Sequence, residues 1–422
     1  MEIKILTNVS YDVAVVGGGT AGVFAAVSAA AAGARTILIE KNGVLGGTST
    51  VGGINYPGLF FAWGKQIIAG HCWNAIKRME SLGFCRIPEI AYERREHWLE
   101  QIRYNTFAYC AVLDELCAEH GVEVCFHSML TAAEEQEDGV TLLVAQKDGV
   151  KQVEARIVID ATGDANLVQM LGYPCMESAQ LQPSTLSVSL GGYDADAVDV
   201  EALTAELASG LEAGVLPAWT VPATVARGVF KKELRFHVPT PKGSDTSDQK
   251  SLLEISARRD AFSIICFLRT CKGLSSLFAS EFSNECGVRE TKRVLGEYVI
   301  TAEDYISGRH FDDAVCYAFY PIDLHIPPYD VKQQYFSPEH CATVPYRALI
   351  PKGASRILVA GRILSSDTDA NSALRVQAPC MAMGQAAGCA AAIAARQGVC
   401  VSDVEYQALC RELTRQGAIV PL

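Results

Sequence analysis

Three glycines, Gly17, Gly19 and Gly22, are the first residues whose type and spacing suggest chemistry. Their G-x-G-x-x-G pattern follows a short apolar run and precedes an alanine-rich stretch and a second apolar run that ends on Glu40. This order predicts a strand, a tight turn, a helix, a second strand and a terminal acid. The turn lets backbone approach a pyrophosphate at a helix N-terminus, and the acid accepts ribose hydroxyls. The sequence therefore predicts a dinucleotide site, with an ordinary βαβ unit as the alternative.

A pair of arginines, Arg289 and Arg293, forms a second group of candidates, with Glu290 between them. The i, i+4 spacing predicts that both arginines lie on one face of a helix. Two guanidinium groups could clamp an anionic substrate or stabilise charge that develops on a cofactor. The alternative is an ion-pair network that joins two domains, supported by Glu290 and by Glu297 nearby. The sequence favours neither interpretation.

His325 is the candidate proton acceptor. It lies in the segment YPIDLHIPP, which we expect to be a loop that leads into prolines. An imidazole with a near-neutral pKa could take a proton while a hydride leaves a C–H bond. A structural histidine is an equally good interpretation, and His71 is a weaker candidate for the same role. No H-E-x-x-H sequence suggests a metal site.

Three later segments favour FAD over NAD as the dinucleotide. A glycine-dense loop that starts at Gly46 suggests that backbone approaches more of the ligand than a nicotinamide fold requires. An expected strand ends in ATGD, which offers Asp164 to the hydroxyl network of a ribityl chain or a pyrophosphate. A further expected strand ends at Gly361, and a helix that begins near Ala378 could direct its positive N-terminal end at the flavin pyrimidine ring.

Nine motifs carry a resemblance to a known family. They read GGGTAG, EKNGVLGGTST, GKQIIAG, DATGDA, GVRETKRVLGEY, YPIDLH, VPYRALIPKG, VAGR and MAMGQAAG. With these motifs the chain resembles, over nearly its whole length, the FAD-dependent oxidoreductases of the fumarate-reductase and glutathione-reductase-like superfamily. More narrowly, it resembles a bacterial branch whose substrates are largely unassigned. The residues that we expect to contact FAD are Gly17, Gly19, Thr20, Ala21, Gly22, Glu40, Lys41, Gly46, Gly47, Thr48, Ala161, Gly163, Asp164, Gly361, Arg362, Leu374 and Arg375.

The chain also departs from its relatives. Many of them show a Thr-His pair after the VAGR strand, whereas this chain has Asp367 and Thr368, so no histidine role is carried over there. Disulfide reductases of the superfamily carry a redox cysteine pair after the second glycine pair, but residues 48–57 contain no cysteine. No second dinucleotide fingerprint follows either. Cys266 and Cys271 lie in an apolar run, where packing is the better interpretation.

Composition limits the classes of function. The 422 residues are 49% hydrophobic and 20% charged, which suits a globular enzyme with an ample core. A formal net charge of −12 without basic blocks argues against a nucleic acid partner. No apolar stretch is long enough to predict a membrane span, and the N-terminal residues do not resemble a signal peptide. The 15 cysteines lack C-x-x-C spacing, so we expect reduced thiols and a cytoplasmic protein.

The expected fold class is α/β. A Rossmann-like FAD-binding domain, a parallel sheet with a β-meander, would combine residues 1–50, 105–180 and 341–422. Residues 51–104 would form a helical insertion that lines the active site, with helices at about 65–82 and 91–104. Residues 181–340 would form an inserted α+β substrate domain with an antiparallel sheet.

The function that we expect is that of an FAD-dependent oxidoreductase. It would move a hydride between flavin N5 and a carbon of a small, polar, anionic organic substrate, with His325 as proton acceptor. A flavoprotein that acts on RNA is one alternative, against which the acidic charge argues. A non-catalytic flavin-binding scaffold or sensor is the other. The oligomeric state is not apparent from the sequence.

Overall fold

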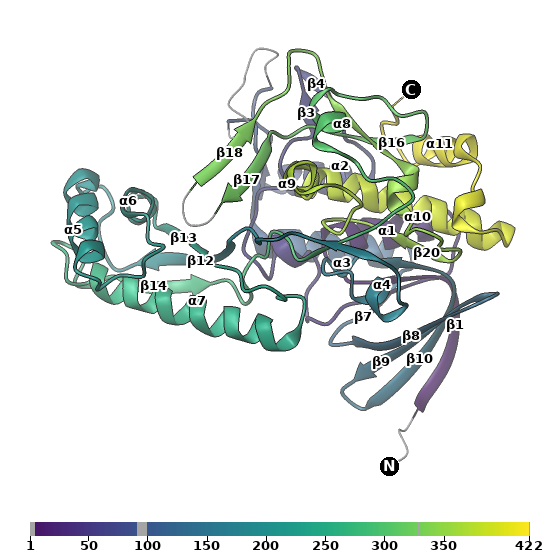
Figure 1. The fold of residues 1–422 in the computed structure, drawn as a ribbon, viewed down its shortest axis with the longest axis horizontal. Coiled ribbons are helices and arrows are strands. Elements are labelled where there is room, and N and C mark those ends of the chain that lie inside the picture. Colours follow the sequence, from purple (N-terminus) through teal and green to yellow (C-terminus); the bar gives the residue numbers. More distant parts are fainter. Residues whose placement is uncertain (1–4, 91–98, 327–329, 422) are drawn as a thin grey trace.

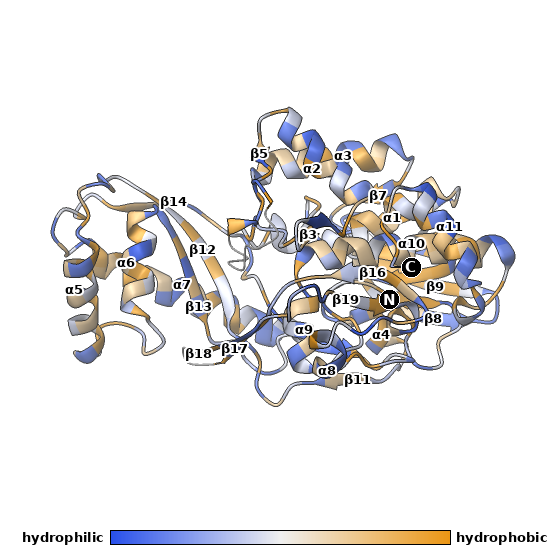
Figure 2. Cartoon of the chain, turned by 90° about the horizontal axis from the view of Figure 1, so that it is seen from above, coloured by the Kyte–Doolittle hydropathy of each residue, from blue (hydrophilic) through white to orange (hydrophobic). Residues whose placement is uncertain are grey.

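The computed structural model describes residues 5–90, 99–326 and 330–421, and it consists of a large and a small lobe (Figure 1). The large lobe is built around one sheet and holds both ends of the chain. The small lobe comes from the middle of the chain and extends away from the large one (Figure 2). The arrangement confirms the predicted fold class, a Rossmann-like sheet with a β-meander beside an antiparallel sheet that carries helices.

The large sheet has a parallel part and an antiparallel part. The parallel strands are β7 (Glu123–Cys125), β2 (Thr36–Ile39), β1 (Ile5–Val16), β10 (Gly149–Asp160) and β20 (Ile357–Val359). β9 (Gly139–Gln146) and β8 (Met129–Gln136) continue the sheet from the first half of β10 as an antiparallel meander. β2, β20 and the last four residues of β1 and β10 are buried, which explains why these stretches read as continuous apolar runs.

The register of the parallel strands brings their carboxyl ends to one edge. Val16 pairs with both Ile39 and Asp160, and Asp160 also pairs with Val359. The segments that follow β1, β2, β10 and β20 therefore begin side by side. In open α/β sheets this edge is where ligands bind.

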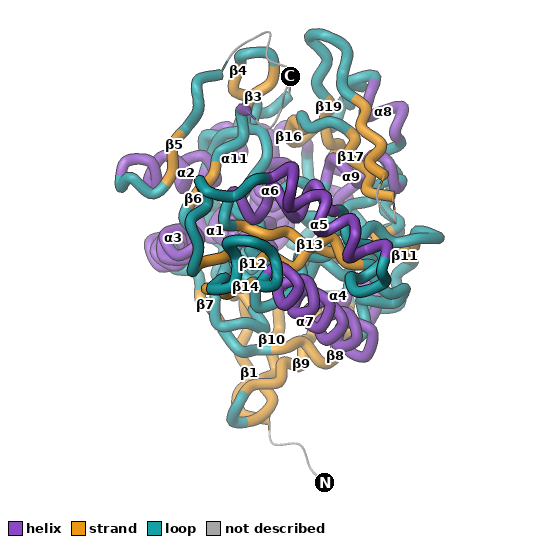
Figure 3. The backbone as a smooth tube through the Cα atoms, turned by 90° about the vertical axis from the view of Figure 1, so that its left-hand side faces the viewer, coloured by secondary structure: helices purple, strands orange, loops and turns teal. Residues whose placement is uncertain are grey.

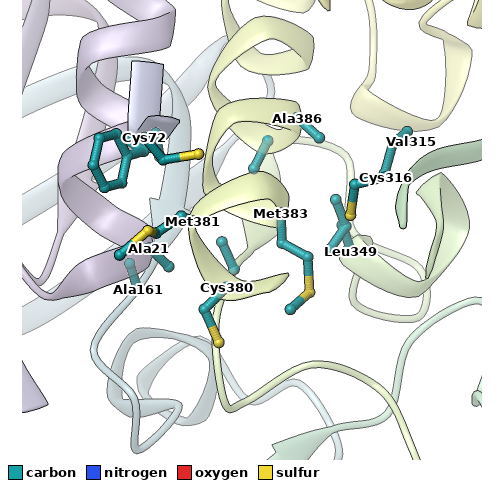
Figure 4. Close-up of a cluster of buried hydrophobic side chains, with 14 of the residues drawn as sticks. Ala21, Cys72, Ala161, Val315, Cys316, Leu349, Cys380, Met381, Met383 and Ala386 are labelled. Atoms are coloured by element: carbon teal, nitrogen blue, oxygen red, sulfur yellow. The ribbon is translucent and has the colours of Figure 1, made fainter. Parts of the chain in front are cut away.

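Helices α1 (Thr20–Ala31) and α10 (Gln377–Gln397) cover one face of this sheet in close contact. A Cβ atom added to Gly384 would lie 2.1 Å from the Ala21 carbonyl oxygen, and one added to Gly388 would lie 2.1 Å from that of Ala25. Glycine is therefore required at both positions for the two backbones to approach. Figure 4 shows Met381 on α10 among the buried side chains that surround this contact.

Among the described residues, α10 is the one helix long and apolar enough to cross a membrane. Its most apolar window is completely buried inside the fold. The sequence analysis predicted a helix here, beginning near Ala378, but did not identify it as long and apolar enough to span a membrane. Its apolar character is explained by packing against α1 and the large sheet.

The small lobe is a three-stranded antiparallel sheet with helices on one face (Figure 3). Its strands, in spatial order, are β13 (Glu233–Val238), β12 (Ser184–Gly191) and β14 (Phe278–Phe282). Its helices are α5 (Val200–Glu212), α6 (Pro222–Phe230) and α7 (Ser247–Leu268). Leu234 and Phe236 of β13 join the apolar core beneath the helices. Because side chains alternate along a strand, Arg235 and His237 point to the opposite, polar face.

The remaining elements are short or peripheral. They are β3 (Phe61–Ala62), β4 (Lys65–Gln66), α2 (His71–Ser81), β5 (Cys85–Arg86), β6 (Arg103–Tyr104), α3 (Thr106–Glu119), α4 (Asn166–Met170), β11 (Cys175–Glu177), β15 (Lys292–Val294), α8 (Ala302–Ile306), β16 (Ala314–Ala318), β17 (Ile322–Ile326), β18 (Asp330–Gln334), β19 (Ala342–Pro345), α9 (Thr368–Leu374) and α11 (Tyr406–Arg415).

Two predicted helices differ from the structure. The helix expected at 65–82 begins only at His71, because Lys65 and Gln66 pair with β3 in a small hairpin. Of the helix expected at 91–104, residues 91–98 lie outside the described residues, and Arg103 and Tyr104 form a strand paired with β5. All fifteen cysteines are free thiols; Cys271 is buried, but Cys266 is exposed on α7, where packing does not explain it.

Candidate functional site

A cavity of about 650 Å³ opens at the carboxyl edge of the parallel strands. It extends from the glycine turn after β1 to Arg289 and Arg375, and the first residues of α7 form another part of its wall. Its volume falls within the range of cofactor and small-molecule sites. Of the expected cofactor and catalytic residues, those on its wall are Gly17, Gly19, Thr20, Ala21, Glu40, Lys41, Gly47, Thr48, Ala161, Gly163, Asp164, Arg289, Gly361, Arg362 and Arg375.

The three glycines of the fingerprint have different surroundings. Gly17 has a φ of 100°, the left-handed conformation that favours glycine, and a Cβ there would lie 2.5 Å from the Ala161 carbonyl oxygen. A Cβ on Gly22 would lie only 1.8 Å from the Gly17 carbonyl oxygen. A Cβ on Gly19 would instead meet nothing closer than the Gly47 Cα, at 4.0 Å. The space above Gly19, at the N-terminus of α1, is therefore open to a ligand phosphate.

Glu40 is fixed at the end of β2 by backbone donors. Its Oε2 accepts from the Gly18 N–H at 2.6 Å and its Oε1 accepts from the Asn42 N–H at 2.7 Å. Burial raises the pKa of this carboxyl group. Each oxygen keeps a second lone pair, so Glu40 can still accept ribose hydroxyls.

The second glycine pair packs against the first. The Gly46 N–H donates to the Gly18 carbonyl oxygen at 2.9 Å, and the Thr20 hydroxyl donates to the Gly46 carbonyl oxygen at 3.2 Å. Gly46 thus supports the turn without lining the cavity, whereas Gly47 and Thr48 lie on its wall. The loop is thus bonded to the glycine turn at Gly46 and lines the cavity at Gly47 and Thr48.

In the segment after β10, the Asp164 carboxylate forms an ion pair with the Arg362 guanidinium. The Asp164 Oδ1 accepts from the Arg362 guanidinium at 2.5 Å and from the Thr291 hydroxyl at 2.8 Å. The buried Nε of Arg362 has no partner among the described residues. A buried donor without a partner is costly, which points to a ligand atom at this position.

The far end of the cavity carries two arginines from different parts of the chain. Arg289 follows β14 in sequence, and Arg375 lies in the turn between α9 and α10. Both guanidinium groups belong to residues of the cavity wall, and burial together with the positive charge of Arg375 lowers the pKa of Arg289. Among the described residues, no carboxylate is within salt-bridge distance of either group, and the buried Arg375 Nε has no hydrogen-bond partner. The Asp323 carboxylate offsets part of this charge, since it favours the charged form of both arginines, and the remaining positive charge suits an anion.

The two arginines proposed from the sequence separate in the structure. The prediction that they share a helix face is wrong, because residues 292–294 form strand β15, which pairs with β11. Arg289 reaches the cavity, with its Nη1 donating to the Pro183 carbonyl oxygen at 2.5 Å. Arg293 is buried away from the cavity, where its Nη1 lies 3.5 Å from a Glu290 oxygen. Arg289 therefore stays a candidate for anion binding, whereas Arg293 forms an ion pair with Glu290.

His325 lies on strand β17 and not in a loop, because residues 322–326 pair with β18. Its Nε2 lies 3.1 Å from the Asp323 Oδ2, and a carboxylate only accepts, so Nε2 carries the proton and Nδ1 keeps the lone pair. Burial lowers the pKa of His325 below its ordinary value despite this carboxylate, and the ring is neutral at pH 7. His325 is not on the cavity wall; its ring packs edge-on against His237, 5.2 Å between centroids.

His237 is a site residue that the sequence analysis missed. The Arg289 Nη2 lies 3.4 Å from its Nε2, and because a guanidinium only donates, that nitrogen is the acceptor. Burial and Arg289 lower the pKa of His237 to about 3, so it too is neutral. The signal was present in the sequence: Glu233, Arg235 and His237 alternate with apolar residues in a strand pattern that gives them one common face.

The remaining candidates lie elsewhere. Gly22 and Leu374 are buried behind the cavity wall. His71 begins α2, where its Nε2 is 3.0 Å from the Gln416 Oε1 and burial lowers its pKa to about 4. Asp367, which replaces the expected Thr-His pair together with Thr368, caps α9 by accepting from the Ala370 N–H. Among the described residues, no group of His, Cys, Asp and Glu could hold a metal ion.

Comparison with known proteins identifies the family. The sequence profile of the family described as FAD dependent oxidoreductase matches residues 12–413, and the chain belongs to this family. A search of curated proteins gave no match.

Solved structures show more distant likenesses. A geranylgeranyl bacteriochlorophyll reductase-like protein from Thermoplasma acidophilum is 13% identical, covering 97% of this chain and 83% of its own, with a TM-score of 0.46. BexE is 13% identical, covering 96% of this chain and 66% of its own, with a TM-score of 0.47. PieE, solved with FAD and substrate, is 15% identical over 44% of this chain and 35% of its own, with a TM-score of 0.28.

The cofactor of this family is FAD, and the cavity fits it. The open space above Gly19 and the unpartnered Nε of Arg362 are two positions where a ligand atom completes the protein. Glu40 and the N-terminus of α1 would hold the ribose and the pyrophosphate, and Asp164 the hydroxyls between the pyrophosphate and the ring. The charge on Arg289 and Arg375 is not needed for these contacts.

Proposed function

We propose that this FAD-dependent oxidoreductase transfers a hydride between flavin N5 and a carbon of a small, polar, anionic organic substrate. Arg289 and Arg375 carry the proposal, because both line the cavity and neither forms a salt bridge with a described carboxylate, although the Asp323 carboxylate lies near enough to favour the charged form of both. Planar guanidinium groups recognise carboxylates by paired hydrogen bonds. The substrate would thus be an organic acid held by its carboxylate. The motifs also support the finer placement among fumarate-reductase-like and glutathione-reductase-like flavoproteins.

Four residues would act on the substrate directly or through a neighbour. Arg289 and Arg375 bind and orient the carboxylate, and the His237 Nε2 holds Arg289 in place. His325 remains the proposed proton acceptor although its ring lies behind the cavity wall, because Asp323 holds Nε2 protonated and leaves the Nδ1 lone pair free. In the described part of the chain, Nδ1 makes no hydrogen bond. The small lobe and the β17–β18 hairpin supply Arg289, His237 and His325, which supports the proposal of a substrate domain at residues 181–340, whereas Arg375 comes from the turn before α10.

An anaerobic screen of organic acids against purified holoenzyme, followed by flavin absorbance, tests the proposal. An acid should bleach the flavin, and an amide or ester of the same skeleton should not. Arg289→Met and Arg375→Met should each raise the KM at least tenfold, since a charge-assisted hydrogen bond contributes about 1.5–3 kcal/mol. Arg411→Met, on the exposed surface of α11, is the matched control.

Two outcomes would refute the proposal. Bleaching by a neutral compound with unchanged KM in both arginine variants would show that the substrate is not an anion. Protein that contains FAD and is bleached by no organic compound would fit the scaffold alternative. A separate result concerns the proton acceptor: His325→Ala with an unchanged rate of flavin reduction would remove His325 from that role and leave the anion site intact.

A further inference from the structure

We propose that Gln182 is a positioning residue that holds Arg375 in place while leaving its positive charge available to the substrate. The inference rests on the proposed function, because it concerns the same anion site. Gln182 is 2% exposed and lies just before β12, between the buried Glu290 and the cavity arginine. Its side chain joins three groups that no other described residue connects.

Glu290 determines which way the Gln182 amide faces. The Gln182 backbone N–H donates to the Glu290 Oε1 and the side-chain Nε2 donates to the Glu290 Oε2, both at 3.2 Å. A carboxylate only accepts hydrogen bonds, so the NH₂ end of the amide must point towards it. The amide oxygen is therefore directed the opposite way, into the anion site.

The amide oxygen binds two parts of that site. The Gln182 Oε1 accepts from the Arg375 Nη2 at 3.2 Å and from the His325 backbone N–H at 3.1 Å. One atom thus contacts both the strand that carries the proton acceptor and the guanidinium that would bind the substrate, whose Nη2 also donates to the Asp323 carbonyl oxygen at 3.3 Å. The Thr240 hydroxyl, which donates to the Gln182 carbonyl oxygen at 2.7 Å, fixes the backbone of Gln182 itself.

The identity of the residue matters because of charge. An amide oxygen orients Arg375 without neutralising it, whereas a carboxylate at the same place would form an ion pair and compete with the substrate. Glu290 is balanced elsewhere, by Arg293, whose Nη1 lies 3.5 Å from the Glu290 Oε2. Gln182 therefore lies between the buried Glu290–Arg293 ion pair and Arg375, which forms no salt bridge with a described residue and feels Asp323 and Glu290 only from a greater distance.

Exchanging the two side chains tests the inference. The double variant Gln182→Glu/Glu290→Gln keeps one amide, one carboxylate and the net charge, but it moves the carboxylate beside Arg375. Acetate, malonate and succinate serve as anionic probes and succinamide as a neutral one, each titrated into holoenzyme while perturbation of the flavin spectrum is followed. Glu290→Gln alone controls for the loss of the partner of Arg293. Gln182→Glu alone adds a carboxylate beside Arg375, and Gln397→Glu, on the exposed end of α10, is its control for an added charge elsewhere.

The double variant should contain FAD, melt within a few degrees of Glu290→Gln and bind the anionic probes at least tenfold more weakly, with succinamide binding unchanged. Recovery of wild-type anion affinity in the double variant would show that Gln182 and Glu290 form only a structural hydrogen-bonded pair, and it would overturn the inference. Equal losses for succinamide and succinate would overturn it too. Wild-type protein that binds none of the three anions would refute the proposed function itself, a result distinct from either.

Discussion

Alanine substitutions at two glycines of the fingerprint should separate cofactor binding from folding. At Gly19 the backbone is extended, with φ −70° and ψ −175°, a conformation that alanine adopts without strain. The added Cβ meets no protein atom closer than 4.0 Å. As a helix cap, alanine is less favourable than glycine by about 0.5–1 kcal/mol, and the less flexible unfolded chain offsets this by about 0.4–1 kcal/mol. The free energy of unfolding of the apo-protein should therefore change by less than about 0.5 kcal/mol.

FAD binding should respond differently. The new methyl group occupies the open space above the N-terminus of α1, where we place the pyrophosphate, and it blocks close approach to the backbone N–H groups. Loss of one hydrogen bond to a charged group amounts to about 1.5–3 kcal/mol, equivalent to a roughly 10- to 150-fold higher dissociation constant. Titration of apo-protein with FAD, followed by quenching of flavin fluorescence, measures this change.

Gly22→Ala supplies the contrasting case. Its Cβ would lie 1.8 Å from the Gly17 carbonyl oxygen, and reaching the 3.0 Å limit requires the two segments to separate by about 1.2 Å. Overpacking of this kind costs about 1–3 kcal/mol, so the apo-protein itself should be destabilised. Thermal unfolding of both apo-variants gives the comparison. A Gly19→Ala variant with wild-type FAD affinity, or a Gly22→Ala variant with wild-type stability, would refute the reasoning.

Two further predictions concern the closure of the cavity and the response to acid. Lys41 and Glu285 form a partly exposed ion pair at 3.1 Å between the two lobes. Removing it by Lys41→Gln or Glu285→Gln should reduce the free energy of FAD binding by about 0.5–1 kcal/mol, which raises the FAD dissociation constant two- to fivefold. The double variant should add little, and strictly additive effects would show that the pair is not the cause. Burial and His120 hold the pKa of His71 at about 4, so the unfolded chain binds more protons than the folded one below pH 6.5. The free energy of unfolding should therefore fall by about 2.5 kcal/mol between pH 7.5 and 4.5 on account of His71. His71→Gln should flatten the pH profile by that amount, and equal profiles would contradict the assignment.

The nucleotide part of the site was predictable because its signals are local. The turn at Gly17, the acid at Glu40 and the ATGD segment each follow a strand directly, and the carboxyl ends of parallel strands must meet at one edge. The sequence did not show, however, which glycines contact a ligand and which only allow close packing. Whether a glycine accommodates a phosphate, as proposed for Gly19, or another backbone segment, as at Gly384, depends on what faces it in space.

The substrate end was harder to predict because long-range pairing decides it. The i, i+4 spacing of Arg289 and Arg293 indicated a helix, but Arg293 pairs with Met176, more than a hundred residues earlier in the chain. His325 was assigned to a loop because prolines follow it, yet its strand is completed by residues 330–334. In both cases a partner strand overrode the local signal.

The anion site that we propose is formed by both lobes, and this affects how it can select a substrate. Arg289 and His237 belong to the chain of the small lobe, whereas Arg375 lies beside the N-terminus of α10, the helix that packs on α1. An anion held by both guanidinium groups contacts both lobes at once, and its position relative to the cofactor is fixed by two rigid elements. Like charges that face each other repel until the anion arrives, so the same pair rejects a neutral molecule of equal shape. The second arginine thus contributes most through specificity, and this is why a neutral analogue is the most informative probe of the site.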